Sequence, residues 1–388
     1  MTREPDATPP TAVPGPWVPR GPAHPLALEV LLHGPVSRAE LARRVGLSPG
    51  SVTRLTGPLV ADGVLVEVPD TRPSRVGRPS QPLDVAADAH HFVGVKLTGD
   101  RAHAVLVTFR AEVVAATERP LADHRPGAVA DLTAELVGWG TAQGLPVTGA
   151  GVSIGARVED AAHVVRAPFL DWSDVPFLDL LRARTDVPVV LANDVDALTA
   201  LTHWFGEGRG VPTFALVTIG AGVGYGLVAN GRPVRAADAG LGLLGHHPLD
   251  PQGPVCPLGH RGCATAMLTT PSITAQVGLA LGRPVGYAEV LGLAAAGEPA
   301  AVRVVGDSGR ALGRLLAAAA NFTLSPLVVL GGEGAGLATA APDAVADGLH
   351  ADRDPLAHDP ALAVQPPDFG QWARGAAVEA IRRFVLGD

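Results

Sequence analysis

The sequence predicts a winged helix-turn-helix module followed by an α/β body with two lobes. Two short capped helices joined across Gly46, followed by an alternating strand, are typical of the helix-turn-helix unit. From His91 onward short apolar strands alternate with helices, which is the pattern of an α/β fold. The three-strand opening of that region recurs at Phe214, so we expect two lobes of similar build that face a cleft.

Length and composition exclude a small stapled module and a membrane protein. The chain has 388 residues, of which 47% are apolar and 18% charged, so at roughly 150 residues per domain we expect two or three folded units. Gly, Pro and Arg interrupt every apolar run before it reaches the roughly 18 residues of a membrane span. The two cysteines, Cys256 and Cys263, fit a reduced, cytoplasmic protein. Residues 1–23 are rich in proline and are expected to form a disordered leader.

The net charge of −8 is distributed unevenly along the chain. Residues 91–388 hold 21 basic and 29 acidic side chains, which accounts for the whole excess, whereas residues 1–90 hold nine of each. Within residues 38–80 there are seven arginines and four acids, a net charge of +3. An acidic chain argues against nucleic-acid binding when taken as a whole, but this distribution confines a modestly basic surface to one small module.

The DNA-binding module is expected to cover residues 24–85. Ser37 is placed as an N-cap, with Glu40 completing a capping box, and Ser48 caps the helix that follows. In a helix-turn-helix the second of these helices is the reader, which lies in the major groove. Pro58 is expected to break the reader helix into two short pieces. The alternating strand VLVEV and the basic, proline-rich stretch after it are typical of a wing.

Arginine and hydroxyl side chains of this module are the candidate DNA contacts. Arg54 on the reader helix is expected to read guanine, while Ser48 and Ser51 are expected to hold phosphates. The supporting helix and the wing would contact the DNA backbone and the minor groove. The complete set is Arg38, Arg43, Arg44, Ser48, Ser51, Thr53, Arg54, Arg72, Arg75 and Arg78. The alternative interpretation is that these arginines are only solvated and that Ser48 is only a helix cap.

The body is expected to span residues 90–388. One lobe would cover about 90–205 together with the C-terminal helix, and the other lobe about 206–370. In each lobe three consecutive short strands open the unit, and alternating helices and strands follow. A buried strand that ends at Asn193 precedes a helix in the first lobe, and the final helix lies near residues 371–385.

Several segments of the chain resemble ROK proteins, a family of bacterial repressors and sugar kinases. They are NDVDALTALTHWFGEG (193–208), TIGAGVGYGLVANGRPVRAADAGLGLLGHHPLDPQGPVCPLGHRGCAT (218–265) and LVVLGG (327–332), preceded by SRAELARRVGLSPGSVTRL and GRPSQPL. No one segment is decisive, but their order and spacing are specific. The resemblance covers nearly everything after about His24, and it implies an actin-like ATPase (RNase H-like) fold with two lobes around a nucleotide site.

The resemblance implies a phosphotransfer site whose residues are only partly present. Asp194 stands where the family has its catalytic base, now vestigial, although a plain helix cap is the alternative interpretation. Asp196 replaces the asparagine that commonly ends this motif. The ligand-binding positions would be Asn193, Asp194 and His246. The nucleotide-binding positions, which turn geometry alone also explains, would be Gly99, Gly220, Gly222, Gly224, Gly331 and Gly332.

Other positions depart from the pattern of the family's kinases. Lys96 replaces an acid on the metal side of the phosphate loop, and Asp100 places a negative charge where phosphate oxygens would lie. We therefore do not expect ATP and magnesium to bind. Leu243 and Thr265 replace glutamates that contact the sugar, and Phe169 replaces an asparagine. A pocket that has lost these acceptors should bind a polyol poorly.

A metal site is also implied, with one ligand missing. Family members with zinc use the histidine of the Gly-His pair and three cysteines, and the matching positions here are His246, Cys256, Leu258 and Cys263. Leucine cannot bind zinc, whereas a structural zinc site ordinarily has four ligands. His260 or His247 would complete the set, and otherwise the cysteines are small side chains of a loop. The sequence leaves zinc binding open.

These patterns predict a transcriptional regulator, expected to be a repressor, that binds double-stranded operator DNA through its N-terminal module. The ROK-like body would pair copies into a homodimer or higher homo-oligomer and would sense a carbohydrate-like effector through a degenerate kinase site. The alternative is an ATP-dependent sugar kinase, a phosphotransferase acting on an alcohol group, that retains a DNA-binding appendage. A third interpretation is a body without a ligand that acts as a dimerisation platform.

Overall fold

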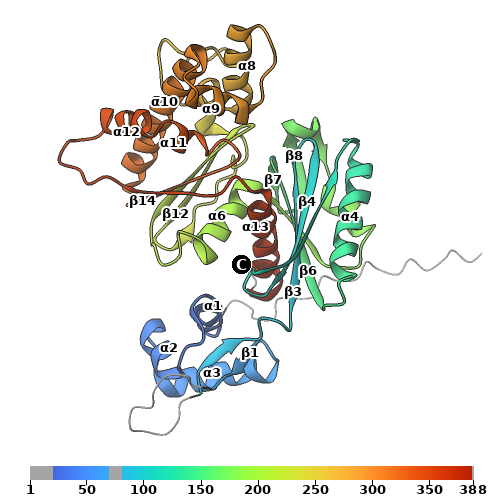
Figure 1. Ribbon diagram of the computed structural model, residues 1–388. Helices are drawn as coiled ribbons and strands as arrows, with labels where there is room; N and C mark the ends of the chain where they lie inside the picture. Colours follow the sequence, from blue (N-terminus) through green and yellow to red (C-terminus); the bar gives the residue numbers. More distant parts are fainter. Residues whose placement is uncertain (1–20, 70–80, 387–388) are drawn as a thin grey trace, which may run out of the picture.

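The structure is a computed structural model that describes residues 21–69 and 81–386. The leader predicted over residues 1–23 falls almost wholly outside these ranges, and so do Arg72, Arg75 and Arg78. Figure 1 shows a small N-terminal module of helices next to a larger body that is built on two sheets. Among the described helices, none combines the length and the apolar character that a membrane crossing demands.

The N-terminal module folds as three helices and a two-stranded sheet. Its elements are α1 (His24–His33), α2 (Arg38–Val45), α3 (Pro49–Ala61), β1 (Leu65–Glu67) and β2 (Leu83–Val85). The Ser37 hydroxyl caps α2 by accepting a hydrogen bond from the Glu40 backbone N–H at 3.2 Å. The Ser48 hydroxyl caps α3 in the same way, with the Ser51 N–H as the donor at 3.2 Å. The antiparallel pair of β1 and β2 then completes the winged helix-turn-helix predicted from the sequence.

The reader helix α3 runs through Pro58 without a break, so the prediction of two short pieces is wrong. Proline removes one backbone N–H, which leaves one carbonyl in the preceding turn without its helical partner. Gly57 and Pro58 are both exposed, so water can hydrate that carbonyl. The opposite side of α3 buries Val52, Thr56 and Leu59 in the core of the module, and this packing keeps the helix continuous.

The first sheet of the body has the strand order β10-β6-β3-β4-β5. Its strands are β3 (His91–Leu97), β4 (Arg101–Thr108), β5 (Val113–Pro120), β6 (Val147–Ile154) and β10 (Val189–Asn193). β3, β4 and β5 are antiparallel neighbours, while β6 and β10 run parallel to β3. One face packs against two helices, α4 (Pro126–Thr141) and α5 (Phe177–Arg182).

A small additional sheet lies between β6 and β10 in the chain and was not predicted from the sequence. It consists of β7 (Arg157–Glu159), β8 (His163–Ala167) and β9 (Trp172–Val175), with a 3-10 turn η1 (Pro168–Leu170) before the last strand. These strands are three to five residues long, which is too short for a clear alternating pattern.

The second sheet has the order β13-β12-β11-β14-β15 and repeats the topology of the first. Its strands are β11 (Phe214–Ile219), β12 (Val223–Ala229), β13 (Arg232–Pro233), β14 (Leu327–Gly331) and β15 (Ala361–Val364). In each sheet a three-strand antiparallel meander is extended by two parallel strands on the side of its first strand. This confirms the predicted two-lobed α/β fold, although β15 itself was not predicted.

Helices cover the second sheet on the side away from the first, as Figure 1 shows. They are α8 (Thr270–Leu281), α9 (Tyr287–Ala295), α10 (Pro299–Thr323), α11 (Leu337–Ala340) and α12 (Pro342–Ala351). Two shorter elements, η2 (Leu243–His246) and α7 (Ala264–Leu268), precede them in the chain. The apolar face of α10 packs on β11 and β14 and forms the centre of the second hydrophobic core.

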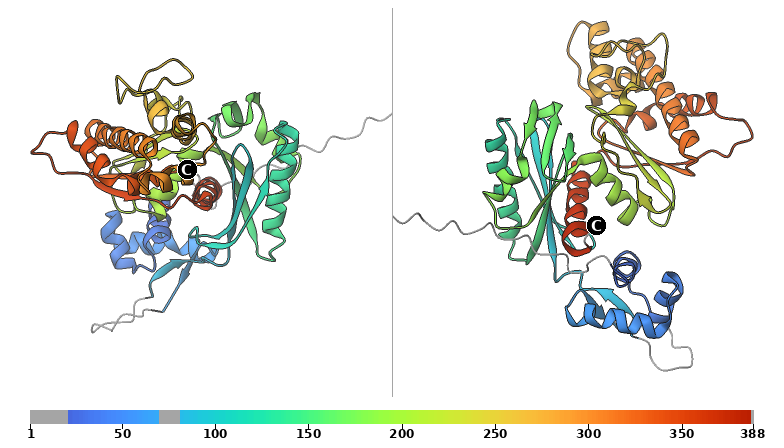
Figure 2. Two further views of the ribbon diagram at one scale, coloured as in Figure 1. Left: turned by 45° about the horizontal axis from the view of Figure 1, so that its top comes forward. Right: turned by 180° about the vertical axis from the view of Figure 1, so that it is seen from behind.

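Two helices lie between the sheets (Figure 2). They are α6 (Asp194–Phe205) and α13 (Phe369–Ile381), the latter continued by a π-helical turn η3 (Arg382–Leu386). α13 returns the end of the chain to β3 and β6. A Cβ atom at Gly94 would lie 1.9 Å from the Ala373 carbonyl oxygen, and one at Gly151 would lie 1.8 Å from that of Ala376. Glycine at these two positions therefore permits the helix to lie directly on the sheet.

The N-terminal module is anchored to the body through the end of α1. The Arg110 guanidinium, in the turn between β4 and β5, donates a hydrogen bond to the Val30 carbonyl at 3.2 Å. Arg209, in the segment between α6 and β11, donates to the Leu32 carbonyl. One hydrophobic cluster also runs from α1 and β2 into β3, α6 and α13, so the module and the body share a core.

Candidate functional site

The reader helix α3 presents a polar, exposed N-terminal half. Ser48, Thr53 and Arg54 are exposed, and Ser51 is half-buried. The Ser48 and Ser51 hydroxyls lie 2.9 Å apart, and the Thr53 hydroxyl donates to the Pro49 carbonyl at 3.1 Å. Arg54 makes no hydrogen bond or ion pair with any residue that the structure describes.

The three arginines of α2 differ from Arg54 because each has a carboxylate partner. Arg38 lies 2.6 Å from Glu67, which ties α2 to β1. Arg44 pairs with Glu40 at 2.7 Å, and Arg43 pairs with the same carboxylate. Of these pairs, Arg38–Glu67 joins two elements of the module, whereas Arg43 and Arg44 pair with Glu40 within α2, and the charge of all three arginines is partly neutralised.

A cleft of about 1260 Å³ lies between the lobes. The ends of β3 and β10 line one side, and the β11–β12 turn and the segment leading into η2 line the other. The predicted ligand and nucleotide positions that line it are Gly99, Asn193, Asp194, Gly220, Gly222, Gly224, His246 and Gly332. Gly331 is not among the residues that line the cleft. The fold therefore brings most of these positions together from widely separated parts of the chain.

Asp194 at the floor of the cleft is neutralised by Lys96. Its Oδ2 atom accepts a hydrogen bond from the Lys96 ammonium group, and both side chains are largely buried. The ammonium nitrogen also lies 5.2 Å from the centre of the Trp372 ring, within the range of a cation–π contact. The carboxylate of Asp194 therefore already has a cation of the protein as its partner.

Asn193 caps α6, and the backbone engages both ends of its amide. Its Oδ1 atom accepts hydrogen bonds from the Val195 and Asp196 N–H groups at 2.9 and 3.1 Å. Its Nδ2 atom donates to the Ala156 carbonyl at 2.9 Å. The helix-capping role considered for Asp194 therefore belongs mainly to its neighbour, and a ligand would compete with these bonds for Asn193.

Glu333 is a cleft residue that sequence reasoning missed. It follows β14, and its Oε1 atom accepts a hydrogen bond from the Ala221 backbone N–H at 2.5 Å. Backbone N–H groups of a glycine-rich turn are the donors that hold phosphate in nucleotide sites. In this chain one of them already holds a carboxylate of the protein. The signal in the sequence was a charged residue inside the glycine run GGEG.

Asp196 is a second residue whose surroundings the sequence did not reveal. The pKa of Asp196 is raised to about 6, mainly because the carboxyl is buried. The charge of Glu379 acts in the same direction, whereas that of Arg235 opposes the rise. Glu379 on α13 accepts two hydrogen bonds from Arg235 at 3.0 Å, which ties the segment after β13 to the C-terminal helix. Arg382 also donates to Glu379, at 3.0 Å. Asp196 therefore has a pKa of about 6 and is influenced by the charges of Glu379, Arg235 and Arg382.

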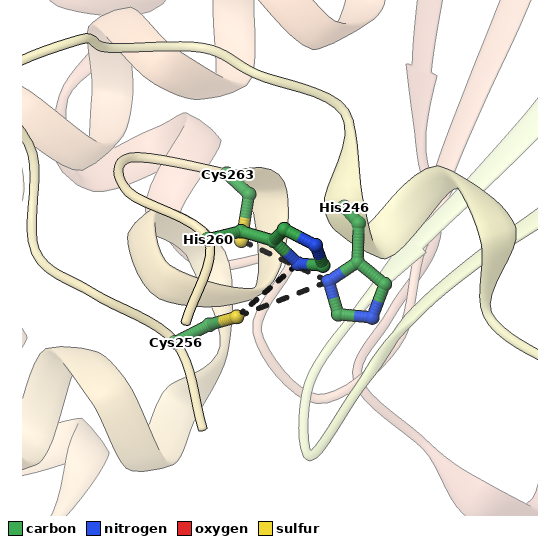
Figure 3. A group of neighbouring side chains, drawn as sticks. All are labelled: His246, Cys256, His260 and Cys263. Atoms are coloured by element: carbon green, nitrogen blue, oxygen red, sulfur yellow. Dashed lines mark hydrogen bonds between the residues drawn. The ribbon is translucent and has the colours of Figure 1, made fainter. Parts of the chain in front are cut away.

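Four side chains with metal-ligating atoms meet where η2 ends and in the loop that leads from it to α7. They are His246, Cys256, His260 and Cys263, and their ligating atoms all lie within 4.8 Å of one another. Figure 3 shows the two imidazole rings and the two thiols converging on one point. Cys256 Sγ lies 3.9 Å from His246 Nδ1 and 3.7 Å from His260 Nδ1. Leu258, at the position of the missing cysteine, is 71% exposed.

The donor set and its spacing fit tetrahedral zinc. Zn–S and Zn–N bonds of ordinary length place ligand atoms roughly 3.4–3.8 Å apart, close to the separations found here. Burial alone would raise the pKa of the Cys256 thiol, but hydrogen bonds from the backbone of Leu258 and His260 outweigh it and the pKa is lowered. The sequence offered His260 or His247 in place of Leu258, and His260 is the one that lies in this group.

A winged helix-turn-helix joined to two lobes of repeated topology defines the class to which the molecule belongs: a DNA-binding module fused to an actin-like body. Sequence comparison refines this assignment. The sequence profile of the ROK family matches residues 92–347, and that of the winged helix-turn-helix DNA-binding domain matches residues 28–66. The chain belongs to the ROK family.

Several curated relatives of the chain are named as repressors, and one is named as a DNA-binding transcriptional dual regulator. The chain is 25% identical over 243 residues to the xylose repressor of Bacillus subtilis (strain 168), a match that covers 61% of this chain and 63% of the relative. It is 25% identical over 317 residues to the N-acetylglucosamine repressor of Escherichia coli O157:H7, covering 78% of this chain and 77% of the relative. The chain spans less than two thirds of the length of the xylose repressors that it matches.

Solved structures share the fold. A ROK family transcriptional regulator, described as a homologue of the Escherichia coli Mlc protein, superposes with a TM-score of 0.79 at 23% identity, covering 94% of this chain and 96% of that one. The ROK hexokinase from Thermus thermophilus superposes with a TM-score of 0.62 at 26% identity, covering 74% of this chain and 97% of that one. The fold is therefore shared by a regulator over nearly the whole chain and by a kinase over three quarters of it.

Proposed function

We propose that this protein is a cytoplasmic transcriptional repressor that binds double-stranded operator DNA through α3. The observation that carries the proposal is Arg54, an exposed cation on the reader helix that no described residue neutralises. An arginine on a helix in the major groove can donate two hydrogen bonds to guanine. Ser48 and Ser51, at the head of the same helix, would hold phosphates. The relatives named as repressors support the same function.

The other predicted contacts would position the module on DNA rather than read bases. Arg38, Arg43 and Arg44 would approach phosphates while keeping their carboxylate partners, and Thr53 would do the same from α3. Arg72, Arg75 and Arg78 lie outside the described residues, and we retain them as wing contacts to the minor groove on the sequence pattern alone.

Selection of bound DNA from a random pool, carried out with the full chain, tests this proposal. Arg54→Ala should weaken binding to the enriched site about tenfold or more and relax the base preference at one position, because a bidentate guanine contact is worth about 1–3 kcal/mol. Arg303→Ala is the matched control, since it removes an exposed arginine of α10 that has no ion pair within the described ranges. No enrichment, or enrichment indifferent to Arg54→Ala, would contradict the proposal.

The body would pair two copies and sense an effector. The module carries a net charge of only +3 over residues 38–80, so a single copy would hold DNA weakly and two readers on a palindromic site would bind far better. A homodimer or higher homo-oligomer is therefore part of the proposal. A ligand that favours one arrangement of the two lobes would change the spacing of the readers and so the affinity for the operator.

Zinc would be a structural cofactor of the second lobe. His246, Cys256, His260 and Cys263 would bind it, and the ion would cross-link a loop that contains little secondary structure. All four ligand atoms, two sulfurs and two nitrogens, come from the chain itself, so four-fold coordination needs no water or other ligand.

An ATP-dependent sugar kinase with a DNA-binding appendage is the second candidate, and the position of Asp194 at the floor of the cleft favours it. Lys96 and Glu333 argue against it, because they already pair with Asp194 and with a backbone N–H of the glycine-rich turn. We expect no sugar phosphate after incubation with ATP, magnesium and a panel of sugars. Detection of a phosphorylated sugar would establish the kinase instead.

A further inference from the structure

Exposed apolar side chains gather at the cleft. In the part of the chain that the structure describes, fifteen large apolar side chains are exposed. Five of these line the cleft, and they are Phe169, Val234, Leu241, Leu243 and Leu258. They come from η1, from the segment between β13 and η2, from the first residue of η2, and from the loop between η2 and α7. Apolar surface that collects in a concave site from separate segments marks a binding site for an apolar group.

Among the described residues that line the cleft, Lys96 is the one lysine or arginine, and its ammonium group already has a partner. The ammonium group of Lys96 is paired with Asp194, and the carboxylate of Glu333 lies on the Ala221 N–H. The cleft is lined by five carboxyl side chains and one ammonium group, that of Lys96. The carboxyl groups belong to Asp100, Asp194, Asp196, Asp238 and Glu333. A phosphate or carboxylate ligand would therefore meet net negative charge in a partly desolvated space, which is unfavourable.

The cleft still offers partners to hydroxyl groups and has room for a large molecule. Asp194 and Asp196 line its floor, and carboxylate oxygens accept hydrogen bonds from hydroxyls. Its volume of about 1260 Å³ is above the range of about 300–1000 Å³ that is usual for small-molecule sites. A monosaccharide alone would leave the apolar wall of Leu241, Leu243 and Leu258 in contact with water.

We infer that the cleft binds an uncharged ligand that joins a hydroxyl-bearing part to an apolar ring or chain, and that it excludes free sugars, sugar phosphates and nucleotides. The hydroxyls face Asp194 and Asp196, and the apolar part covers Phe169 and Leu243. This inference rests on the proposed function, because the ligand is the effector of the regulator.

Calorimetric titration of the full chain with paired probes tests the inference. Phenyl and methyl β-glycosides of glucose, xylose and N-acetylglucosamine differ only in the apolar group, and glucose, glucose 6-phosphate and ATP with magnesium complete the panel. We expect the phenyl glycoside to bind at least tenfold more tightly than its methyl partner in one or more pairs, with no binding of the phosphates. Equal affinities, tighter binding of a free sugar or a phosphate, or no binding by any probe would overturn the inference.

Variants locate the preference in the cleft. Leu243→Glu replaces an apolar side chain that is 68% exposed by a carboxylate, and we expect it to abolish the phenyl preference without a change in melting temperature. Leu356→Glu makes the same exchange at a leucine that is 93% exposed and does not line the cleft, so it should leave the preference intact. Loss of the preference in both variants, or in neither, would contradict the placement.

DNA binding by the same preparations, measured without ligand, separates this inference from the proposed function. Enrichment of an operator together with equal affinities for phenyl and methyl glycosides would overturn the inference and leave the repressor in place. A phenyl preference without any DNA binding would support the ligand class and overturn the repressor.

Discussion

At the scale of single residues, Asp196 gives the protein a specific pH dependence. The pKa of this carboxyl is raised to about 6: burial is the main cause, Glu379 and Asp194 act in the same direction, and Arg235 and Arg382 oppose the rise. In the unfolded chain the pKa is close to 4, so between about pH 4 and pH 6 the native state binds more protons than the unfolded state. The contribution of Asp196 to stability is therefore present below about pH 4 and is lost as the pH rises through 6.

Replacement by asparagine keeps the size of the side chain and removes the titration. We expect Asp196→Asn to be more stable than the native sequence at pH 7, by about 1–2 kcal/mol, and the difference to vanish near pH 4. Denaturant unfolding at a series of pH values measures it. Asp347→Asn, at an exposed position of α12, is the control and should leave the pH profile unchanged. Parallel profiles for Asp196→Asn and the native chain would show that the pKa of this carboxyl is the same in the native and the unfolded state.

Residue identity alone marked positions that depart from the pattern of the family's kinases, but not the contacts that these residues make in the fold. Lys96 was recognised as a departure from an acidic position, yet its partner Asp194 lies 98 residues away in the sequence. Glu333 and Ala221 are 112 residues apart. Such pairs depend on how the two lobes pack, and no local pattern carries that information. Leu258 and His260 are different, because both lie in one short loop. The sequence alone therefore suggested that His260 replaces Leu258 as a ligand.

At the scale of elements, local chemistry predicted the starts of helices well and their continuity less well. Ser37 and Ser48 were placed as caps because their side chains can satisfy orphan N–H groups, and both do so. Pro58 misled the prediction because tertiary packing of the buried face outweighs the loss of one hydrogen bond at an exposed turn. β15 was missed because three of its four residues are exposed at the edge of the sheet and show no alternation.

The loop between η2 and α7 is an element that we expect to depend on metal. Purified chain should contain about one zinc ion, and removal by a chelator should lower the melting temperature, because metal binding contributes to folding free energy. His260→Ala should lose most of the zinc, whereas His247→Ala, at a histidine outside the ligand group, should keep it. Atomic absorption on the purified variants measures the content. Equal zinc in both variants would exclude His260 as a ligand.

At the scale of the whole molecule, the position of the reader module depends on both lobes. Arg110 belongs to the β4–β5 turn of the first sheet, while Arg209 belongs to the segment that leads into the second. Both hold carbonyls at the end of α1, and Arg209 also lies 3.3 Å from His33 Nδ1. A rotation of one lobe against the other would therefore move the two anchors of α1 relative to each other.

Removal of one anchor should loosen α1 without unfolding the body. We expect Arg209→Ala to speed hydrogen exchange of the α1 amides about fivefold, because a hydrogen bond from an exposed arginine is worth roughly 1 kcal/mol. Amides of β3 and β11, in the cores of the two sheets, should exchange as before. Arg232→Ala removes an exposed arginine of β13 that has no ion pair in the described part of the chain, and it should leave α1 unchanged.

Combination with Arg110→Ala should produce a loss larger than the sum of the two single effects, since each arginine keeps α1 in place for the other. Exchange that rises equally in α1, β3 and β11 would show instead that Arg209 stabilises the fold as a whole.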